Sequence, residues 1–227
     1  MSRPITTLFM LESLDGKIST GNSDNLDVDK DFPNIEGVKE GLHQYYEIEM
    51  TTDYYSLNTG RVMAKIGVND KKEYREKVEV RFVIIDNKPH LNENGIDYLC
   101  HWVEKLFLVT TNKNHPAFNL DYDNLEILYY DELDLGKLFE DLYDKGAKRI
   151  TIQSGGNMNG LFIRNDLIDY VHIVIAPILI GGGDVSTLVD GESIKSVDEL
   201  GLLRPLELLE CNKLEDSYIE LKYKVRR

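Results

Sequence analysis

The stretch RITIQSGGNMNG, residues 149–160, decides the fold. It opens with Ile150–Ile152, a short apolar run of the kind that forms a buried strand. Gly155 and Gly156 follow, and Asn157 stands where a helix N-cap is expected, ahead of an apolar segment. The stretch therefore predicts a strand, a glycine turn and the first turn of a helix.

This arrangement is suited to an anion, because the first backbone N–H groups of a helix lack partners and lie at the positive end of the helix dipole. Gly155 and Gly156 carry no Cβ, so a phosphate can approach the backbone closely. An ordinary tight turn between a strand and a helix has the same pattern. The glycines match neither the Rossmann nor the P-loop spacing, so both interpretations stay open on these residues.

A second glycine-rich turn follows in the continuation LFIRNDLIDYVHIVIAPILIGGG, residues 161–183. A strand is predicted at Tyr170–Ile175, and a triple glycine ends the segment at 181–183. Two glycine-rich turns thus follow two strands. Open α/β sheets bind their ligands at such strand ends, so we expect a small-molecule site there.

Composition narrows the class of protein. The 227 residues are 42% hydrophobic, which is sufficient for one large core, and we expect a single domain over residues 1–227. A net charge of −14 argues against a nucleic-acid partner, because phosphates would be repelled. Cys100 and Cys211 lack metal-ligand spacing and are expected to be reduced thiols. No apolar run approaches ~20 residues and no signal-peptide core is present, so we expect a soluble cytoplasmic protein without a membrane partner.

Strands alternate with helices along most of the chain. We expect strands at Ile5–Leu11, Tyr54–Leu57, Val80–Asp86, Lys105–Thr110, Leu125–Tyr130, Ile150–Ile152 and Tyr170–Ile175. We expect helices at Asn34–Met50, Val62–Ile66, within Ile96–Val103, at Leu133–Lys145 with Gly146 as its C-terminal glycine, and at Met158–Ile163. Pro205–Leu214 and Tyr218–Val225 read as an antiparallel hairpin. The chain is therefore predicted to be a three-layer α/β fold with a largely parallel central sheet, helices on both faces and a C-terminal hairpin.

Two further segments are candidates for function. A polar loop rich in Asn, Asp and Gly extends from Glu12 to about Lys30, and such a loop is either functional or a mobile surface loop. Asn58-Thr59-Gly60-Arg61 is a turn between a strand and a helix with a cation beside its glycine. Arg61 is either a fork for a phosphate or a member of a surface salt bridge.

Several motifs occur together in the order of one known family. They are SLDGKI at 13–18, TGRV at 59–62, QSGGNMNG at 153–160, LIDYVHIVIAPILIGGG at 167–183, and the final hairpin. The chain thereby resembles, over essentially its whole length, the RibD C-terminal family, the reductase domain of riboflavin biosynthesis with a dihydrofolate reductase-like fold. Because the chain begins at the first strand and has no zinc-deaminase signature, no preceding deaminase domain is expected.

The resemblance implies an NADPH-dependent reductase that transfers a hydride from the nicotinamide C4 to the ribose C1 of 5-amino-6-(5-phosphoribosylamino)uracil. It implies that Arg61 selects the 2′-phosphate of NADPH and that Asp15, Ser23 and Gln153 face the substrate. Gln153 stands where many members of the family carry Glu. It also implies a homodimer. The residues implied to bind the cofactor are Thr59, Gly60, Arg61, Val62, Gly155, Gly156, Asn157 and Met158.

Asp15 is the acid of the matched SLDGKI motif, so it is the candidate that orients or protonates the substrate. Alternatively it caps the turn beside Gly16. Two other functions stay open for the chain as a whole. One is reduction by NADPH of another heterocyclic or carbonyl compound, and the other is non-catalytic nucleotide binding.

Overall fold

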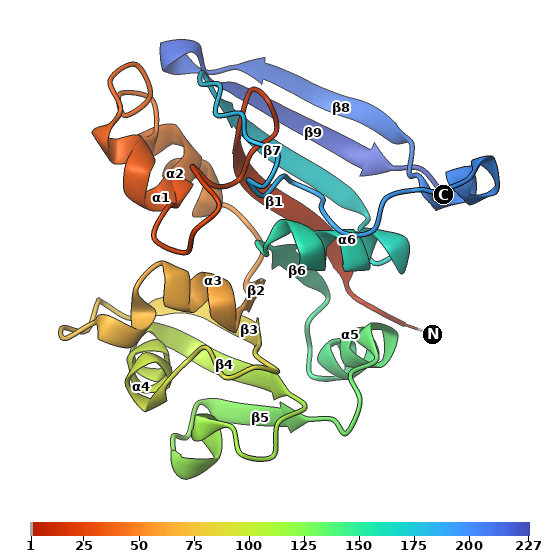
Figure 1. Ribbon diagram of the computed structural model, residues 1–227. Coiled ribbons are helices and arrows are strands. Elements are labelled where there is room, and N and C mark those ends of the chain that lie inside the picture. Colours follow the sequence, from red (N-terminus) through yellow and green to blue (C-terminus); the bar gives the residue numbers. More distant parts are fainter. Residues whose placement is uncertain (1) are drawn as a thin grey trace. The chain divides into compact units, whose positions relative to one another are not determined.

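The computed structural model describes residues 2–227, which form two compact units (Figure 1). Unit one comprises Asp53–Ser154 together with the N-terminal residues up to Pro4. Unit two comprises Ile5–Thr52 and Gly155–Arg227. A single domain over residues 1–227 stays a prediction.

Unit one contains a parallel sheet with the strand order β5-β4-β3-β2-β6. In this sheet Leu57 lies opposite Val83 on one side and Ile152 on the other. All three side chains are fully buried, as expected for the middle of a parallel sheet. The strands are β2 (Tyr55–Thr59), β3 (Val78–Ile85), β4 (Val103–Thr110), β5 (Leu125–Tyr129) and β6 (Arg149–Ile152).

Helices cover both faces of this sheet. Met63 from α3 (Gly60–Lys65) and Leu99 from α4 (Glu93–Trp102) join one buried cluster with Leu106 and Leu108 of β4. The alternate side chains of β4 lie on the other face. There Tyr55 stacks on Phe107, and its hydroxyl donates to the carbonyl of Lys145, the C-cap of α5 (Leu135–Asp144). The short 3₁₀ turns of this unit are η2 (Val68–Asp70) and η3 (Pro116–Asn119).

Unit two contains a mixed sheet with the order β1-β7-β9-β8. The strand β1 (Ile5–Ser13) runs parallel to β7 (Tyr170–Ala176). The strands β9 (Ile219–Val225) and β8 (Leu206–Lys213) complete it as an antiparallel hairpin. The hairpin turn is η5 (Glu215–Ser217), and Asp216 and Ser217 have positive φ angles there.

One face of this sheet packs against the segment that joins β1 to unit one. Phe9 and Leu11 of β1 and Val174 of β7 form a buried cluster with residues of that segment. The segment contains α1 (Val28–Asp31), η1 (Phe32–Asn34) and α2 (His43–Glu49). Because side chains alternate along a strand, Leu8, Met10 and Glu12 face the other side of the sheet. The remaining elements of the unit are α6 (Gly156–Arg164) and η4 (Val197–Leu202).

The predicted fold class is confirmed as α/β with mostly parallel strands, helices and a C-terminal antiparallel hairpin. The predicted helix over Asn34–Met50 is wrong in its first half, because α2 begins at His43. Gly37 adopts a left-handed φ of 84°, which ends any helix there. Asn157 is not the N-cap of α6, since that position is held by Gly155. The strand β1 also continues two residues beyond its predicted end, through Glu12 and Ser13.

Within residues 2–227, the helices are too short or too polar to cross a lipid bilayer.

Candidate active site

The predicted turn at Thr59–Val62 lies at the carboxyl end of β2. Thr59 is the N-cap of α3, and its hydroxyl oxygen accepts the N–H of Val62 at 3.4 Å. Gly60 is buried, and Arg61 is exposed in the first turn of the helix. The turn therefore places Arg61 at the strand end where a ligand of an α/β sheet is expected.

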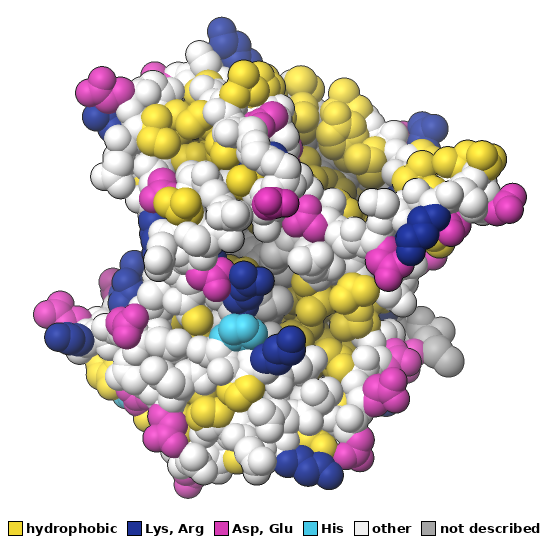
Figure 2. Space-filling model, in the orientation of Figure 1, with side chains coloured by type: hydrophobic (Ala, Val, Ile, Leu, Met, Phe, Trp, Pro, Cys, Tyr) yellow, Lys and Arg dark blue, Asp and Glu magenta, His cyan; other side chains and the backbone are white. Residues whose placement is uncertain are grey.

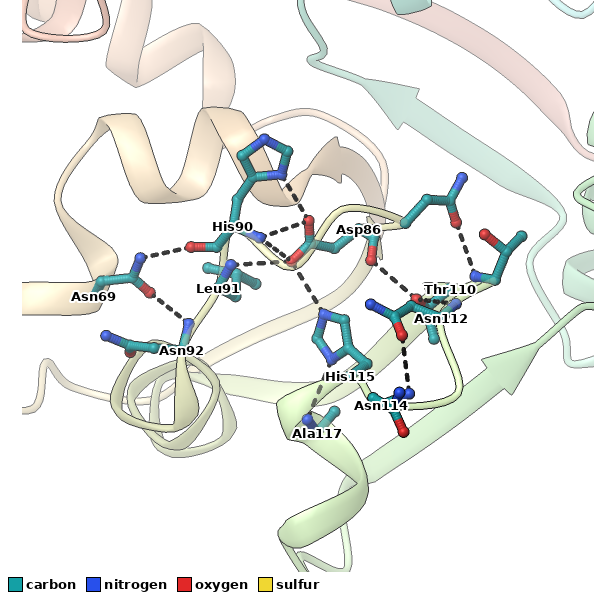
Figure 3. A network of polar contacts seen from close by, with 12 residues as sticks. Asn69, Asp86, His90, Leu91, Asn92, Thr110, Asn112, Asn114, His115 and Ala117 are labelled. Atoms are coloured by element: carbon teal, nitrogen blue, oxygen red, sulfur yellow. Dashed lines mark hydrogen bonds and ion pairs between the residues drawn. The ribbon is translucent and has the colours of Figure 1, made fainter.

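A buried carboxylate that the sequence did not reveal holds this strand end together. Asp86 directly follows β3, and its side chain is fully buried. It accepts the backbone N–H of His90 at 3.1 Å and of Leu91 at 3.0 Å (Figure 3). It also contacts His90 Nδ1 at 2.9 Å and His115 Nε2 at 3.1 Å. The hydroxyl of Thr110, at the end of β4, donates to the Asp86 carbonyl.

The two imidazoles act as donors to this carboxylate. His115 Nδ1 accepts the N–H of Ala117 at 3.1 Å, so the ring proton lies on Nε2 and points at Asp86. Burial acts to raise the pKa of Asp86, but the hydrogen bonds from His115, the Leu91 amide and His90 outweigh it, so this pKa lies below its ordinary value. Asp86 is thus a buried, ionised carboxylate whose charge is balanced by donors.

The Asp86 carboxylate also packs against Gly60. A Cβ at position 60 would overlap the Asp86 carboxylate carbon and both of its oxygens. Only glycine allows α3 to start this close to the end of β3. The Gly60 position that the resemblance assigned to the cofactor is therefore also required by packing inside the protein.

Gln153 follows β6 in unit one and is half-buried. Its backbone N–H donates to the Leu57 carbonyl at 2.9 Å. Its side-chain Oε1 accepts the Ser56 hydroxyl at 3.2 Å. Two residues after Ser56 on β2, the buried Asn58 carries an Oδ1 that has no hydrogen-bond partner within residues 2–227.

Asp15, in unit two, is used by the protein itself. Its carboxylate accepts the Ser13 hydroxyl at 2.6 Å and the backbone N–H groups of Ile180 at 3.0 Å and Gly181 at 2.6 Å. The pKa of Asp15 is lowered to about 2, mainly by the hydrogen bond from Ser13 and next by the hydrogen bond from the Ile180 amide. Asp15 is therefore ionised at neutral pH and bridges two loops, which agrees with the capping alternative and does not suit a proton donor.

Lys17 strengthens the same bridge between loops. Its Nζ donates to the carbonyls of Gly182 at 2.8 Å and Val185 at 3.0 Å. The backbone N–H of Leu188 donates to the Gly16 carbonyl at 3.2 Å. The motif at 13–18 and the glycine-rich segment at 180–188 thus form one connected structure at the carboxyl ends of the parallel strands β1 and β7.

The start of α6 combines a packing surface with an open one. Side chains at Gly156 and Gly160 would overlap Asp190, so these two glycines let the 187–190 loop lie directly on the helix. A Cβ at Gly155 would meet no atom within 4 Å, and no side chain caps the helix there. The open face at Gly155 is the part of this turn that an anion can reach, whereas the Asp190 carboxylate lies beside Gly156.

Asn157, Met158 and Ser23 are the remaining residues that the sequence predicted for the site. Asn157 is exposed and Met158 half-buried in the first turn of α6. Ser23 is exposed in the loop before α1, where its carbonyl accepts the Leu26 N–H at 3.1 Å. Glu12, which was not predicted as a site residue, is buried with an Oε2 that has no partner within the described residues.

Asp86, Asp190 and Glu12 were missed because their surroundings depend on residues far away in the sequence, such as His115 for Asp86 and Gly156 for Asp190. A usable signal existed for Glu12 and Asp86, since each is an acid directly after the apolar run of a buried strand, where acids are unusual. The structure brings Asp15 together with Ile180 and Gly181, and Gln153 together with Ser56.

Comparison with known proteins agrees with the motifs. The profile of the RibD C-terminal domain matches residues 4–219. The 2,5-diamino-6-ribosylamino-4(3H)-pyrimidinone 5′-phosphate reductases of Methanothermobacter thermautotrophicus and Aquifex aeolicus are 38% and 37% identical to this chain over 93 and 79 residues. These matches cover 40% and 34% of this chain, but only 42% and 35% of the relatives' own lengths.

A solved structure supports the fold. The diaminohydroxyphosphoribosylaminopyrimidine deaminase/5-amino-6-(5-phosphoribosylamino)uracil reductase of Thermotoga maritima superposes with a TM-score of 0.69 at 16% identity. The superposition covers 99% of this chain and 57% of that one. With the family profile matched from residue 4 to residue 219, the chain belongs to the RibD C-terminal domain family.

Proposed function

We propose that this protein is an NADPH-dependent reductase of a phosphorylated ribosylaminopyrimidine, and that it transfers a hydride to C1 of the ribose. The observation that carries the proposal is the family match over residues 4–219, together with relatives named as reductases of such a compound. The positions of the connected loops at the ends of β1 and β7 agree with a small-molecule site.

The residues present fit a phosphate-bearing cofactor. Gly155 has an open face at an uncapped helix start, which is suited to a phosphate, and Arg61 is an exposed guanidinium beside Gly60. Bound NADPH would supply the hydride. The residues proposed to hold it are Thr59, Gly60, Arg61 and Val62 in unit one, and Gly155, Gly156, Asn157 and Met158 in unit two.

Ser23 and Gln153 are proposed to contact the substrate. Asp15 is proposed to position the 180–188 segment, because its carboxylate already accepts from Ser13, Ile180 and Gly181. A loop held in this way can orient a substrate without any proton transfer from Asp15.

Two substrates fit the proposal. One is 5-amino-6-(5-phosphoribosylamino)uracil, which the resemblance to the family implies, and the other is the 2,5-diamino-pyrimidinone phosphate named for the curated relatives. The test is to supply each compound with NADPH and follow the loss of reduced-nicotinamide absorbance. Turnover of either supports the reductase, and the larger kcat/KM identifies the substrate. NADPH binding without turnover of either compound would favour another heterocyclic or carbonyl substrate, or a non-catalytic nucleotide-binding protein.

A homodimer is part of the proposal. Every residue of the edge strand β8 is exposed, including Leu206, Leu208 and Leu209. Figure 2 shows hydrophobic side chains gathered in the part of the view where Figure 1 draws β8 and β9. An exposed, leucine-rich edge strand is a surface that a second copy would cover. A cytoplasmic location stays a prediction.

A further inference from the structure

Two carboxyl groups three residues apart in sequence have opposite environments at the end of β1. Asp15 is exposed and accepts three hydrogen bonds from Ser13, Ile180 and Gly181. Glu12 is only 8% exposed, and its Oε2 has no hydrogen-bond partner within residues 2–227. A pair of acids held in such different surroundings is the arrangement by which enzymes divide ionised and protonated roles.

A buried polar atom without a partner costs free energy, so its presence calls for a reason. Glu12 is the penultimate residue of β1 and lies opposite Ile175 of the parallel strand β7. Its position is therefore the carboxyl end of parallel strands, where the loops at 13–18 and 180–188 are joined and where ligands of α/β sheets bind. A ligand at this strand end is a partner that the Glu12 oxygen lacks in the protein alone.

We propose that the carboxyl group of Glu12 is the proton donor of the reduction. This role rests on the proposed function, because it requires a ribosylamine substrate. The protonation state agrees with it, since burial raises the pKa of Glu12 from 4.5 to about 7. The charged groups of the same loop, Asp15 and Lys17, are bonded to the 180–185 segment, and β7 presents the apolar Ile175 in register with Glu12.

Proton transfer from Glu12 accompanies the opening of the ribose ring. The bond between C1 and the ring oxygen of the ribose breaks as the exocyclic nitrogen forms a double bond to C1. The ring oxygen takes the proton of Glu12 and becomes a hydroxyl, and Glu12 is left as a carboxylate. The hydride supplied by the reduced cofactor then adds to C1, and the electron pair of the double bond returns to nitrogen. Glu12 regains its proton from water.

The test compares Glu12→Gln with a matched control. Glu104→Gln removes another carboxylate that has an oxygen without a partner, but Glu104 lies at the start of β4, the opposite end of a parallel strand. Loss of a general acid lowers the rate by about 10²–10⁴-fold, so we expect a fall of that size in kcat for Glu12→Gln and near-wild-type kcat for Glu104→Gln. The Kd for NADPH should remain close to that of the wild type in both variants, and Glu12→Asp should restore part of the lost rate.

Two readouts separate proton donation from a structural role. The wild-type kcat should fall as the pH rises through about 7, and this limb should vanish in Glu12→Gln. In protein with ¹³C-labelled glutamate carboxyls, the resonance that is absent from Glu12→Gln should titrate near pH 7 and shift when the pyrimidine substrate is added without cofactor. The Glu104 resonance should not shift on that addition.

The outcomes distinguish the two proposals. If the wild type and Glu12→Gln turn over equally, or if the Glu12 resonance titrates near 4.5 and ignores the substrate, Glu12 is not the proton donor, and the reductase stands. If the wild type turns over neither pyrimidine, the proposed function is overturned, and the role of Glu12 falls with it.

Discussion

The carboxylate of Asp86 occupies the space that a side chain at Gly60 would need. Asp86 cannot easily move away, because the backbone N–H groups of His90 and Leu91 and the imidazole of His115 all donate to it. The start of α3, and with it the position of Arg61, is therefore set by a buried charge at the end of the neighbouring strand.

Gly60→Ala should destabilise the protein, because the new methyl group overlaps a buried and fully bonded carboxylate. Overpacking of this kind costs about 1–3 kcal/mol, and urea unfolding measures it. Gly201→Ala is the control, since a Cβ there meets no atom within 4 Å. Equal midpoints for the two variants would show that Asp86 yields readily and does not fix the turn.

Asp86→Asn should lower the free energy of unfolding at neutral pH by about 2–4 kcal/mol, because an amide cannot replace a buried, multiply bonded carboxylate. The lowered pKa of Asp86 means that its ionised form stabilises the folded state above its unfolded-state pKa near 4. That contribution is lost as the pH falls through the folded-state pKa. The stability gap between wild type and variant should therefore narrow below about pH 4 in urea titrations. A gap independent of pH would contradict an ionised Asp86.

Local patterns in the sequence predict most strands within a few residues, because buried parallel strands contain continuous apolar runs such as Phe82–Ile85. The helix predicted over Asn34–Met50 is wrong in its first half for a physical reason. Its apolar spacing reflects burial of Val38 and Leu42 in a cluster of irregular turns, and Gly37 supplies a left-handed φ angle. The spacing of apolar residues indicates which residues are buried, and a segment of irregular turns can bury apolar residues at the same spacing as a helix.

The candidate site, too, was predictable from the sequence only where it depends on local patterns. The turns at Thr59 and Gly155 follow from local glycine patterns, so the sequence reveals them. The contact between His115 and Asp86 joins residues 29 positions apart in the sequence, and only the folded chain reveals it. Likewise, Asp15 is recognisable as part of a motif, but its low pKa depends on amides at Ile180 and Gly181.

Arg61→Ala should abolish most of the expected preference for NADPH over NADH, because the guanidinium is proposed to pair with the extra phosphate of NADPH. The two Kd values, measured by cofactor fluorescence titration, should converge, with little change for NADH. Arg75→Ala, which removes a cation that lies over the Trp102 ring, is the control and should keep the preference. A wild type that binds both cofactors equally would contradict the role of Arg61.

Leu208→Lys should shift the protein toward monomers if β8 is the dimer contact. Leu208 is 52% exposed, so the substitution removes little packing within the chain and the fold should persist. Light scattering coupled to gel filtration measures the mass, and circular dichroism checks the fold. Leu179→Lys, at a leucine that is 72% exposed outside β8, is the matched control and should leave the mass unchanged. A wild-type monomer would rule out the dimer altogether.

Glu12 also predicts how stability depends on pH, independently of any substrate. Because the pKa of Glu12 is raised from 4.5 to about 7, the folded state holds a proton that the unfolded state releases first. The associated stability is complete below pH 4.5 and is lost as the pH rises through about 7. The loss is about 3–4 kcal/mol, at 1.36 kcal/mol for each pKa unit. Glu12→Gln has no proton to lose, so its free energy of unfolding should increase relative to that of the wild type between pH 5 and pH 8.

Urea unfolding of both proteins at these two pH values isolates the contribution of Glu12, because all other groups titrate alike in both proteins. A constant difference between the variants would mean that Glu12 is ionised at neutral pH in the folded protein.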